Sequence, residues 1–321
     1  MTILKIDSKL STKGKQCRQY EGLFDKNAEF AFLRSFPEND VIKGAWEMNV
    51  KVAAIEMNCI PYKKEENLET AAKIVRACAQ AGAVLIVLPE LFSTGYSVAD
   101  QDYELSEPVP YGKTTGWMEA LSQELGVFLV GAIIERSEES DDALYDTSVL
   151  TGPEGYIGKY RKICLWGSEN ERFRSGNEYP VFDIGFARLG LQICYEVGFP
   201  EGARALTLSG ATMIAYSAAF SQHRVYAWEI ASRARALENG LFVVASNRYG
   251  EETDVCFAAK SRIIGPQGNV LVETTEENVF VIAEVDMLEE EQQRQAIPYL
   301  RDYKTKLFAE EIGRHVLEKQ G

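Results

Sequence analysis

The stretch that decides the fold covers residues 189–200 and reads LGLQICYEVGFP. Its first half, Leu189–Ile193, is a mostly apolar run that predicts a buried strand, and the Gly-Phe-Pro segment is typical of a helix start. Cys194 falls at the sharp turn between them, as in a nucleophile elbow, which aims a side chain out of a sheet. The N–H of Tyr195 can point at a substrate oxygen there. On its own, such a cysteine is more often an inert buried residue.

Apolar runs on both sides of this stretch extend the pattern over most of the chain. βαβ units and hairpins both occur, so we expect a mixed sheet. So many strands in one chain predict an α/β fold with two sheets packed face to face and helices outside. The expected strands are Val52–Cys59, Val84–Leu88, Val127–Ile134, Leu144–Thr151, Tyr156–Lys159, Val181–Ile184, Ala187–Ile193, Thr212–Tyr216, Leu241–Ser246, Phe257–Ile264 and Val279–Val285. The expected helices are Asn67–Gln80, Thr114–Leu125, about Glu201–Leu208 and Arg224–Asn239.

The two ends of the chain differ from this body. Residues 1–49 are polar and weakly periodic, which predicts an N-terminal extension that either wraps on the body or a partner subunit, or forms a partly disordered tail. Residues 50–286 contain no linker and form the expected catalytic domain. Residues 287–321 are charged and predict a solvated helix and tail.

Composition excludes several classes of protein. The formal net charge is −14, from 48 acidic and 34 basic residues, so nucleic acid and anionic membranes are poor partners. Met1–Lys15 has no apolar signal region, and the longest apolar run, Ala81–Leu88, is too short to span a bilayer. The six cysteines form no CxxC pair, which predicts reduced thiols in a cytoplasmic protein.

Histidine is scarce, which narrows the chemistry. The chain has two histidines, His223 and His315, so a His-rich zinc site is excluded and a Ser–His–Asp site would need His223. Nothing in the sequence calls for a metal or an organic cofactor. Cysteine, glutamate and lysine are therefore the residues on which catalysis should depend.

Two further polar segments follow predicted strands. Glu90 comes directly after Leu88-Pro89, where burial should raise the pKa of its carboxyl and suit it to proton transfer. Residues 159–162 read KYRK, and a cation there could stabilise an oxyanion and a thiolate. Each segment alone is more often a surface loop.

Together, Glu90, Lys162 in its Tyr-Arg-Lys segment and Cys194 in Gly-Leu-Gln-Ile-Cys-Tyr-Glu strongly resemble the nitrilase superfamily of carbon–nitrogen hydrolases. The resemblance covers about residues 50–285 and includes Arg233–Gly240 and Ser261–Asn269. It implies a four-layer α–β–β–α sandwich with two mixed sheets, paired as a homodimer or a higher homo-oligomer.

The resemblance also implies the roles of individual residues. Glu90 is the implied base, Cys194 the nucleophile, and Lys162 with the Tyr195 N–H stabilises the oxyanion. A second glutamate is expected at Glu169, with Glu171 as the alternative. The chain departs from the family pattern at Cys164, a second candidate thiol, and at Ser217. The candidate pocket residues are Tyr96, Trp166, Ala219, Phe220 and His223.

The substrate follows from the residues beside the nucleophile. Tyr195-Glu196 is closer to amidase-like branches than the Trp-Glu of nitrile hydrolysers, and no cation follows it to hold a carboxylate. We therefore expect hydrolysis of a small carboxamide to acid and ammonia. A nitrilase or an N-carbamoyl hydrolase with the same three residues is one alternative, and a non-catalytic binding member is another. His223 or Arg224 could still bind an acidic group.

Overall fold

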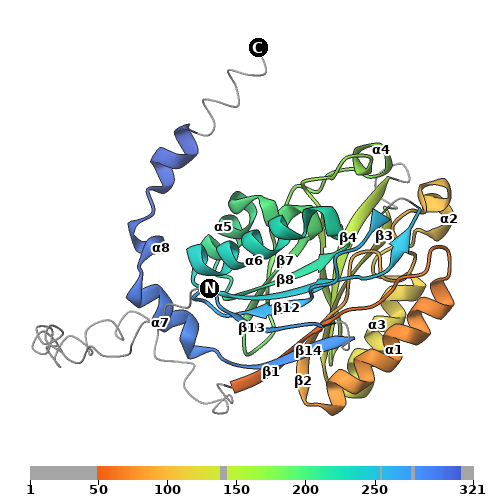
Figure 1. Ribbon diagram of the computed structural model, residues 1–321, viewed down its shortest axis with the longest axis horizontal. Helices are drawn as coiled ribbons and strands as arrows, with labels where there is room; N and C mark the ends of the chain where they lie inside the picture. The colour runs from red at the N-terminus through yellow and green to blue at the C-terminus, as the bar shows by residue number, and fades with distance from the viewer. Residues whose placement is uncertain (1–48, 138–142, 254, 276–278, 312–321) are drawn as a thin grey trace, which may run out of the picture. The chain divides into compact units, whose positions relative to one another are not determined.

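The computed structural model describes residues 49–137, 143–253, 255–275 and 279–311, all of which belong to one unit of the chain (Figure 1). The predicted extension, residues 1–49, lies outside the described part except for Asn49, which begins the first strand. His315 and the end of the predicted charged tail also lie outside it.

The first sheet has six strands in the order β14-β1-β2-β3-β4-β5. The three central strands β1, β2 and β3 run parallel, and the outer pairings are antiparallel. The parallel strands are joined through helices α1 (Lys64–Gln80) and α3 (Lys113–Leu125), and a tight turn joins the antiparallel strands β4 and β5. The strands are β1 (Asn49–Ile55), β2 (Ala83–Val87), β3 (Phe128–Arg136), β4 (Leu144–Gly152), β5 (Gly155–Arg161) and β14 (Phe280–Asp286).

The second sheet repeats this plan in the order β13-β12-β9-β8-β7-β6. Its central strands β7, β8 and β9 are parallel, and antiparallel strands flank them. The strands are β6 (Val181–Asp183), β7 (Arg188–Ile193), β8 (Met213–Ala218), β9 (Phe242–Asn247), β12 (Arg262–Ile264) and β13 (Val270–Glu273). A two-stranded ribbon, β10 (Glu251–Glu252) with β11 (Val255–Cys256), lies apart from both.

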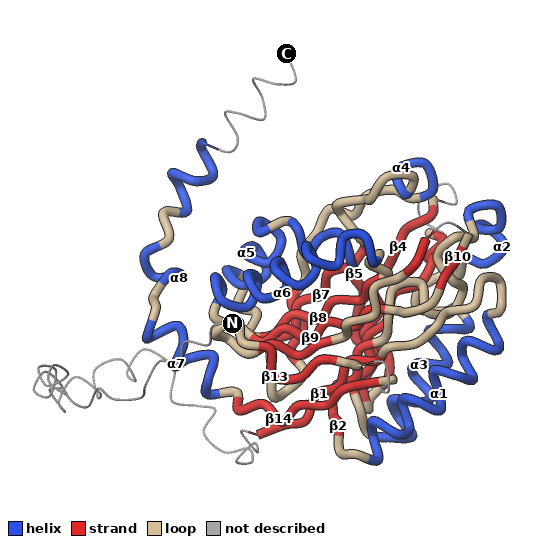
Figure 2. Tube along the Cα trace, in the orientation of Figure 1, coloured by secondary structure: helices blue, strands red, loops and turns tan. Residues whose placement is uncertain are grey.

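The two sheets pack face to face with helices outside, as predicted (Figures 1 and 2). On β1 the side chains alternate: Val52 and Ala54 join the core between the sheets, whereas Ala53 and Ile55 pack under the helices of the first sheet. Those helices are α1 (Lys64–Gln80) and α3 (Lys113–Leu125), and α5 (Pro200–Leu208) and α6 (Val225–Asn239) cover the second sheet.

Two strand predictions were too long, and several short elements were not predicted. The strand predicted as Val52–Cys59 ends at Ile55. Phe257–Ile264 is a strand only from Arg262, because Ala259 and Lys260 adopt positive φ angles of 57° and 66° that a regular strand does not allow. The unpredicted elements are the short strands β10, β11 and β13 and the short helices η2 (Ala99–Gln101), α2 (Asp102–Leu105), α4 (Glu169–Arg172), η3 (Cys194–Gly198), η4 (Gln222–Arg224) and α8 (Tyr299–Asp302). The charged segment after residue 286 begins with α7 (Leu288–Ala296).

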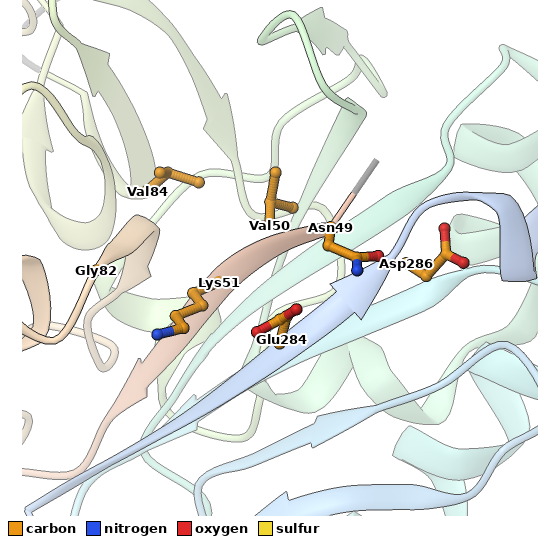
Figure 3. A pocket seen from close by; sticks show the side chains of 7 residues that line it. All are labelled: Asn49, Val50, Lys51, Gly82, Val84, Glu284 and Asp286. Carbon is orange, nitrogen blue, oxygen red and sulfur yellow. The ribbon is translucent and has the colours of Figure 1, made fainter. Parts of the chain in front are cut away.

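Two observations concern the outside of the unit. Within the described ranges, no helix is long and apolar enough to cross a membrane. A hollow lined by Lys51, Glu284 and Asp286, among others, lies where β1 and β2 begin and β14 ends (Figure 3). It is at the opposite end of β2 from Glu90 and contains none of the predicted site residues.

Candidate active site

The predicted catalytic side chains come from the ends of strands in both sheets. Glu90 follows β2, Lys162 follows β5 directly, and Cys194 follows β7 directly. Ala219, from the pocket prediction, follows β8. Since the carboxyl ends of these parallel strands meet where the two sheets face each other, residues far apart in sequence form one cluster.

Cys194 occupies a strained turn. Its φ angle is 45°, in the left-handed region that residues with a side chain rarely adopt, and the 3₁₀ helix η3 begins with it. The first N–H groups of a helix have no partner within the helix, which leaves the Tyr195 N–H available to an oxyanion. The local geometry is therefore that of a nucleophile elbow.

Lys162 lies at the centre of the cluster. Its Nζ is 2.6 Å from Glu90 Oε1, 2.8 Å from Glu169 Oε2 and 3.3 Å from Asp146 Oδ2. All four side chains are at most 1% exposed. Burial alone would lower the pKa of Lys162, but the surrounding carboxylates, Glu90 above all, outweigh burial and raise it, so the ammonium keeps its charge.

Glu90 is held as a carboxylate. Burial alone would raise the pKa of its carboxyl, but the charge of Lys162, with the neighbouring Asp146 and Cys194, outweighs burial, and the pKa is lowered. The Ala219 N–H also donates to Glu90 Oε2 at 2.8 Å. The raised pKa expected from the sequence is therefore wrong, because the buried lysine that pairs with Glu90 comes from a different part of the chain.

Cys194 rests as a neutral thiol. Burial and the Glu90 charge raise the pKa of its thiol well above 9.0, and Lys162 offsets only part of that effect. A neutral thiol next to a carboxylate is an acid beside its base, so the pair can transfer a proton when an electrophile arrives.

The second predicted glutamate is placed by α4. Both Glu169 oxygens contact Lys162 Nζ. The Tyr96 hydroxyl donates to Oε1 at 2.5 Å, and the main-chain N–H of Trp166 donates to Oε2 at 2.8 Å. Glu171 is exposed to solvent instead. Glu169 thus links the lysine to the wall of the pocket.

An apolar pocket opens onto the thiol. Of the five predicted pocket residues, four line it: Tyr96, Trp166, Ala219 and Phe220. The prediction of His223 is wrong, because that side chain is exposed and does not line the pocket. The 3₁₀ helix η4 turns Arg224, the next residue, toward the pocket instead. The Arg224 guanidinium lies 4.5 Å from the centre of the Trp166 ring and lines the pocket.

Asp146 and Phe257 belong to the site but were not predicted from the sequence. A charged residue inside a predicted buried strand could have drawn attention to Asp146. No feature of the neighbouring sequence marks Phe257 as a pocket residue. Cys164 does not line the pocket, and burial raises the pKa of its thiol to about 11, so it is a weak nucleophile. Ser217 is buried in β8, and its hydroxyl has no hydrogen-bond partner among the described residues.

Three carboxylates in this site lie close enough to hold a cation. Oxygens of Glu90, Asp146 and Glu169 all lie within 4.8 Å of one another. Lys162 Nζ already contacts all three, so the ammonium fills the position that a metal ion would take.

Comparison with known proteins gives consistent matches over most of the chain. A family model described as carbon-nitrogen hydrolase matches residues 51–295. A protein named nitrilase from Pyrococcus abyssi is 39% identical over 246 residues, which are 74% of this chain and 90% of that protein. The omega-amidase NIT2 of Xenopus tropicalis is 31% identical over 77% of this chain and 93% of its own. The 2-oxoglutaramate amidase of Bacillus subtilis is 32% identical over 81% and 100%.

Solved structures agree with these matches. Nit3 of Saccharomyces cerevisiae, a member of branch 10 of the nitrilase superfamily, superposes with a TM-score of 0.72 at 28% identity and covers 78% of this chain and 94% of its own. A variant amidase from Nesterenkonia sp. AN1 gives 0.72 at 25% identity over 81% and 99%. In that structure acrylamide has added to the active-site cysteine.

Proposed function

The chain belongs to the carbon–nitrogen hydrolase family of the nitrilase superfamily, and from this premise we propose that it hydrolyses a small carboxamide to a carboxylic acid and ammonia. Its family acts on non-peptide C–N bonds. The observation that carries the proposal is the Cys194 thiol, which lies beside the buried Glu90–Lys162 ion pair and lines an apolar pocket. Similarity to two amidases supports the choice of an amide.

In the proposed acylation, Glu90 takes the thiol proton as Cys194 attacks the amide carbonyl carbon. The carbonyl oxygen becomes an oxyanion, which the Lys162 ammonium and the Tyr195 N–H stabilise. Glu90 then gives its proton to the amide nitrogen, the C–N bond breaks, and ammonia leaves a thioester on Cys194.

In the proposed deacylation, a water molecule replaces ammonia. Glu90 takes a proton from the water, whose oxygen attacks the thioester carbonyl, and the same two donors stabilise the second oxyanion. The carbon–sulfur bond breaks and Cys194 regains a proton through Glu90. The sum is one amide and one water converted to one acid and one ammonia.

The pocket supports a small acyl group. Its wall combines aromatic side chains with small ones, including Ala227 and Ala231 of α6, and one cation, Arg224, at the Trp166 ring. Such a lining favours an apolar acyl chain, which loses water contacts on binding.

Nitrile hydrolysis is the second candidate, and the 39% identity to a protein named nitrilase favours it. An N-carbamoyl substrate is a further alternative, which would release carbon dioxide as well as ammonia. The deciding experiment measures the ammonia released from amides, nitriles and N-carbamoyl compounds that carry the same substituent, with Cys194→Ala as the control.

Release from the amides alone, absent in Cys194→Ala, is the expected result. Release from the nitriles alone would replace the proposal by the nitrilase alternative. Release that persists in Cys194→Ala would overturn the nucleophile assignment. No release from any compound by a folded protein, with no reaction of the thiol with iodoacetamide, would favour a non-catalytic binding protein.

We further propose that the active form is a homodimer in the cytoplasm. The exposed apolar side chains Tyr226, Ile230 and Leu237 of α6 support pairing. The described cysteines are all free thiols, in keeping with a reducing compartment.

A further inference from the structure

Asp146 is a buried acid in the cluster to which the proposed reaction gives no role. It lies on β4 opposite Ile134, and its side chain is fully buried. Its main-chain oxygen accepts the Lys162 N–H at 2.9 Å, so the strand fixes its position relative to the lysine. Its side chain therefore faces Glu90 and Lys162 at close range.

The charges in this cluster do not balance if every acid is ionised. Glu90, Asp146 and Glu169 would then carry three negative charges against the single charge of Lys162. A second described cation, Arg172, acts on Asp146 from the end of α4, but two donors of that guanidinium already bind Asp102 at 2.8 Å. A buried excess of like charge is costly, and retaining a proton on one carboxyl relieves it.

Hydrogen-bond donors show which carboxyl keeps the proton. Glu169 accepts from Lys162, the Tyr96 hydroxyl and the main-chain N–H of Trp166. Glu90 accepts from Lys162 and the Ala219 N–H. Asp146 receives only the longest lysine contact, at 3.3 Å. Its Oδ1 finds no donor in the described part of the chain.

An oxygen of Asp146 also lies within 4.8 Å of an oxygen of Glu90, and two ionised carboxylates at that separation in a buried site repel each other strongly. Burial raises the pKa of Asp146 well above 3.8, in agreement with a shared proton. We propose that Asp146 is a neutral acid in the resting enzyme and acts as a positioning residue, its O–H holding the Glu90 carboxylate toward the Cys194 thiol.

The proposed role explains how Glu90 can be a base between two other acids. The proton on Asp146 removes one repulsive charge and adds one donor, and both changes favour the ionised form of Glu90. This part of the inference rests on the proposed function, since it takes Glu90 as the base. The protonation of Asp146 does not depend on it.

A neutral acid can be replaced by its amide, and this gives the test. Asp146→Asn keeps a donor toward Glu90 without a titratable proton, so its kcat/KM should stay within about threefold of wild type. Asp146→Ala removes the donor, so kcat/KM should fall about 10- to 100-fold, as for loss of one hydrogen bond to a charged group. The acid limb of the pH profile of kcat/KM should also move to higher pH in Asp146→Ala, because Glu90 then binds a proton more readily. Asp183→Asn, at an exposed aspartate, is the matched control.

Infrared spectroscopy with isotope-labelled aspartate tests the proton without any substrate. At neutral pH a protonated carboxyl band should be present in the wild type and in Asp183→Asn, and absent in Asp146→Asn. No such band in the wild type would overturn the inference, even if Asp146→Ala fails to fold. A folded Asp146→Asn as inactive as Asp146→Ala would overturn the positioning role alone. A protein with the band but without amidase activity would refute only the proposed function.

Discussion

At the scale of single residues, the resting site pairs a neutral thiol with a charged base. The Cys194 thiol has a pKa raised well above 9.0, and the Glu90 carboxyl has a pKa lowered from 4.5. The opposite arrangement, a preformed thiolate beside a neutral acid, would attack without a base. The order of these two pKa values therefore makes Glu90 necessary for each attack.

Replacing Glu90 by glutamine should separate turnover from thiol reactivity. The glutamine side chain of this variant cannot receive the thiol proton, so turnover should fall about 10²- to 10⁴-fold. The Cys194 pKa should fall as well, because the repulsive charge of Glu90 is gone and Lys162 remains. Absorbance of the thiolate, followed during a pH titration, should appear at lower pH than in the wild type.

Glu171→Gln is the matched control for this change, since Glu171 is an exposed acid near the same site. It should leave both turnover and the thiol titration unchanged. Wild-type acylation by Glu90→Gln would show that Glu90 is not the base.

The pH profile of kcat/KM should be flat from about pH 6 to about pH 8. Glu90 has a lowered pKa and is ionised throughout this range, so activity is lost only as pH falls toward and below 4.5. Cys194 has a raised pKa, so no gain from thiolate formation appears below 9.0. Steady-state kinetics in a constant-ionic-strength buffer series measures this. A rise through neutral pH would instead indicate a thiol that ionises before it attacks.

The residue types and order of this site could be predicted from the sequence, but their ionisation could not. Glu90, Lys162 and Cys194 each follow a predicted strand, and topology brings strand ends together. The pKa of Glu90 depends on a lysine 72 positions away and on Asp146, which only the folded chain brings near. The prediction that His223 lines the pocket was wrong for a related reason, because a one-residue step in η4 decides which side chain faces the pocket.

At the scale of elements, one buried acid connects the nucleophile turn to the lysine strand. Glu196 of η3 accepts the Tyr160 hydroxyl at 2.6 Å, the Ile163 N–H at 2.9 Å and the Cys164 N–H at 3.1 Å. Its other oxygen accepts the Ile193 N–H at 2.9 Å. The end of β7 is thus held against the end of β5.

Glu196→Ala should destabilise the protein by about 3 kcal/mol or more, because it leaves several buried donors without a partner. Tyr160→Phe removes only one of the four hydrogen bonds and should cost about 1 kcal/mol. Urea denaturation followed by circular dichroism measures both. Equal losses of stability in the two variants would show that Glu196 does not hold the two segments together.

Element prediction succeeded where burial alone sets the pattern. The central strands of both sheets are mostly apolar runs, and their predicted bounds agree with the observed bounds within a few residues. It failed at 257–261, where tertiary contacts override the local pattern: Asn247 and Trp228 bind the main-chain oxygens of Ala259 and Lys260, and these two residues have positive φ. Short helices such as α4 were missed because four residues carry no measurable periodicity.

At the scale of the whole molecule, α6 presents an apolar stripe to solvent. Tyr226, Ile230 and Leu237 follow one another at helical spacing and are 63%, 69% and 38% exposed. Leu208 of the neighbouring α5 is 49% exposed. Large apolar side chains exposed along one face of an outer helix are typical of an interface between subunits.

Ile230→Glu should therefore convert the proposed dimer to a monomer. The substitution places a charge in the middle of the stripe, where pairing would bury it without a partner. Because α6 also carries Ala227 and Ala231 of the pocket wall, loss of the partner subunit should lower activity as well as mass. Sedimentation velocity at several protein concentrations measures the mass. Tyr111→Glu, at a loop residue that is 85% exposed, is the control and should leave the mass unchanged. A wild-type protein that sediments as a monomer at all concentrations would refute pairing through α6.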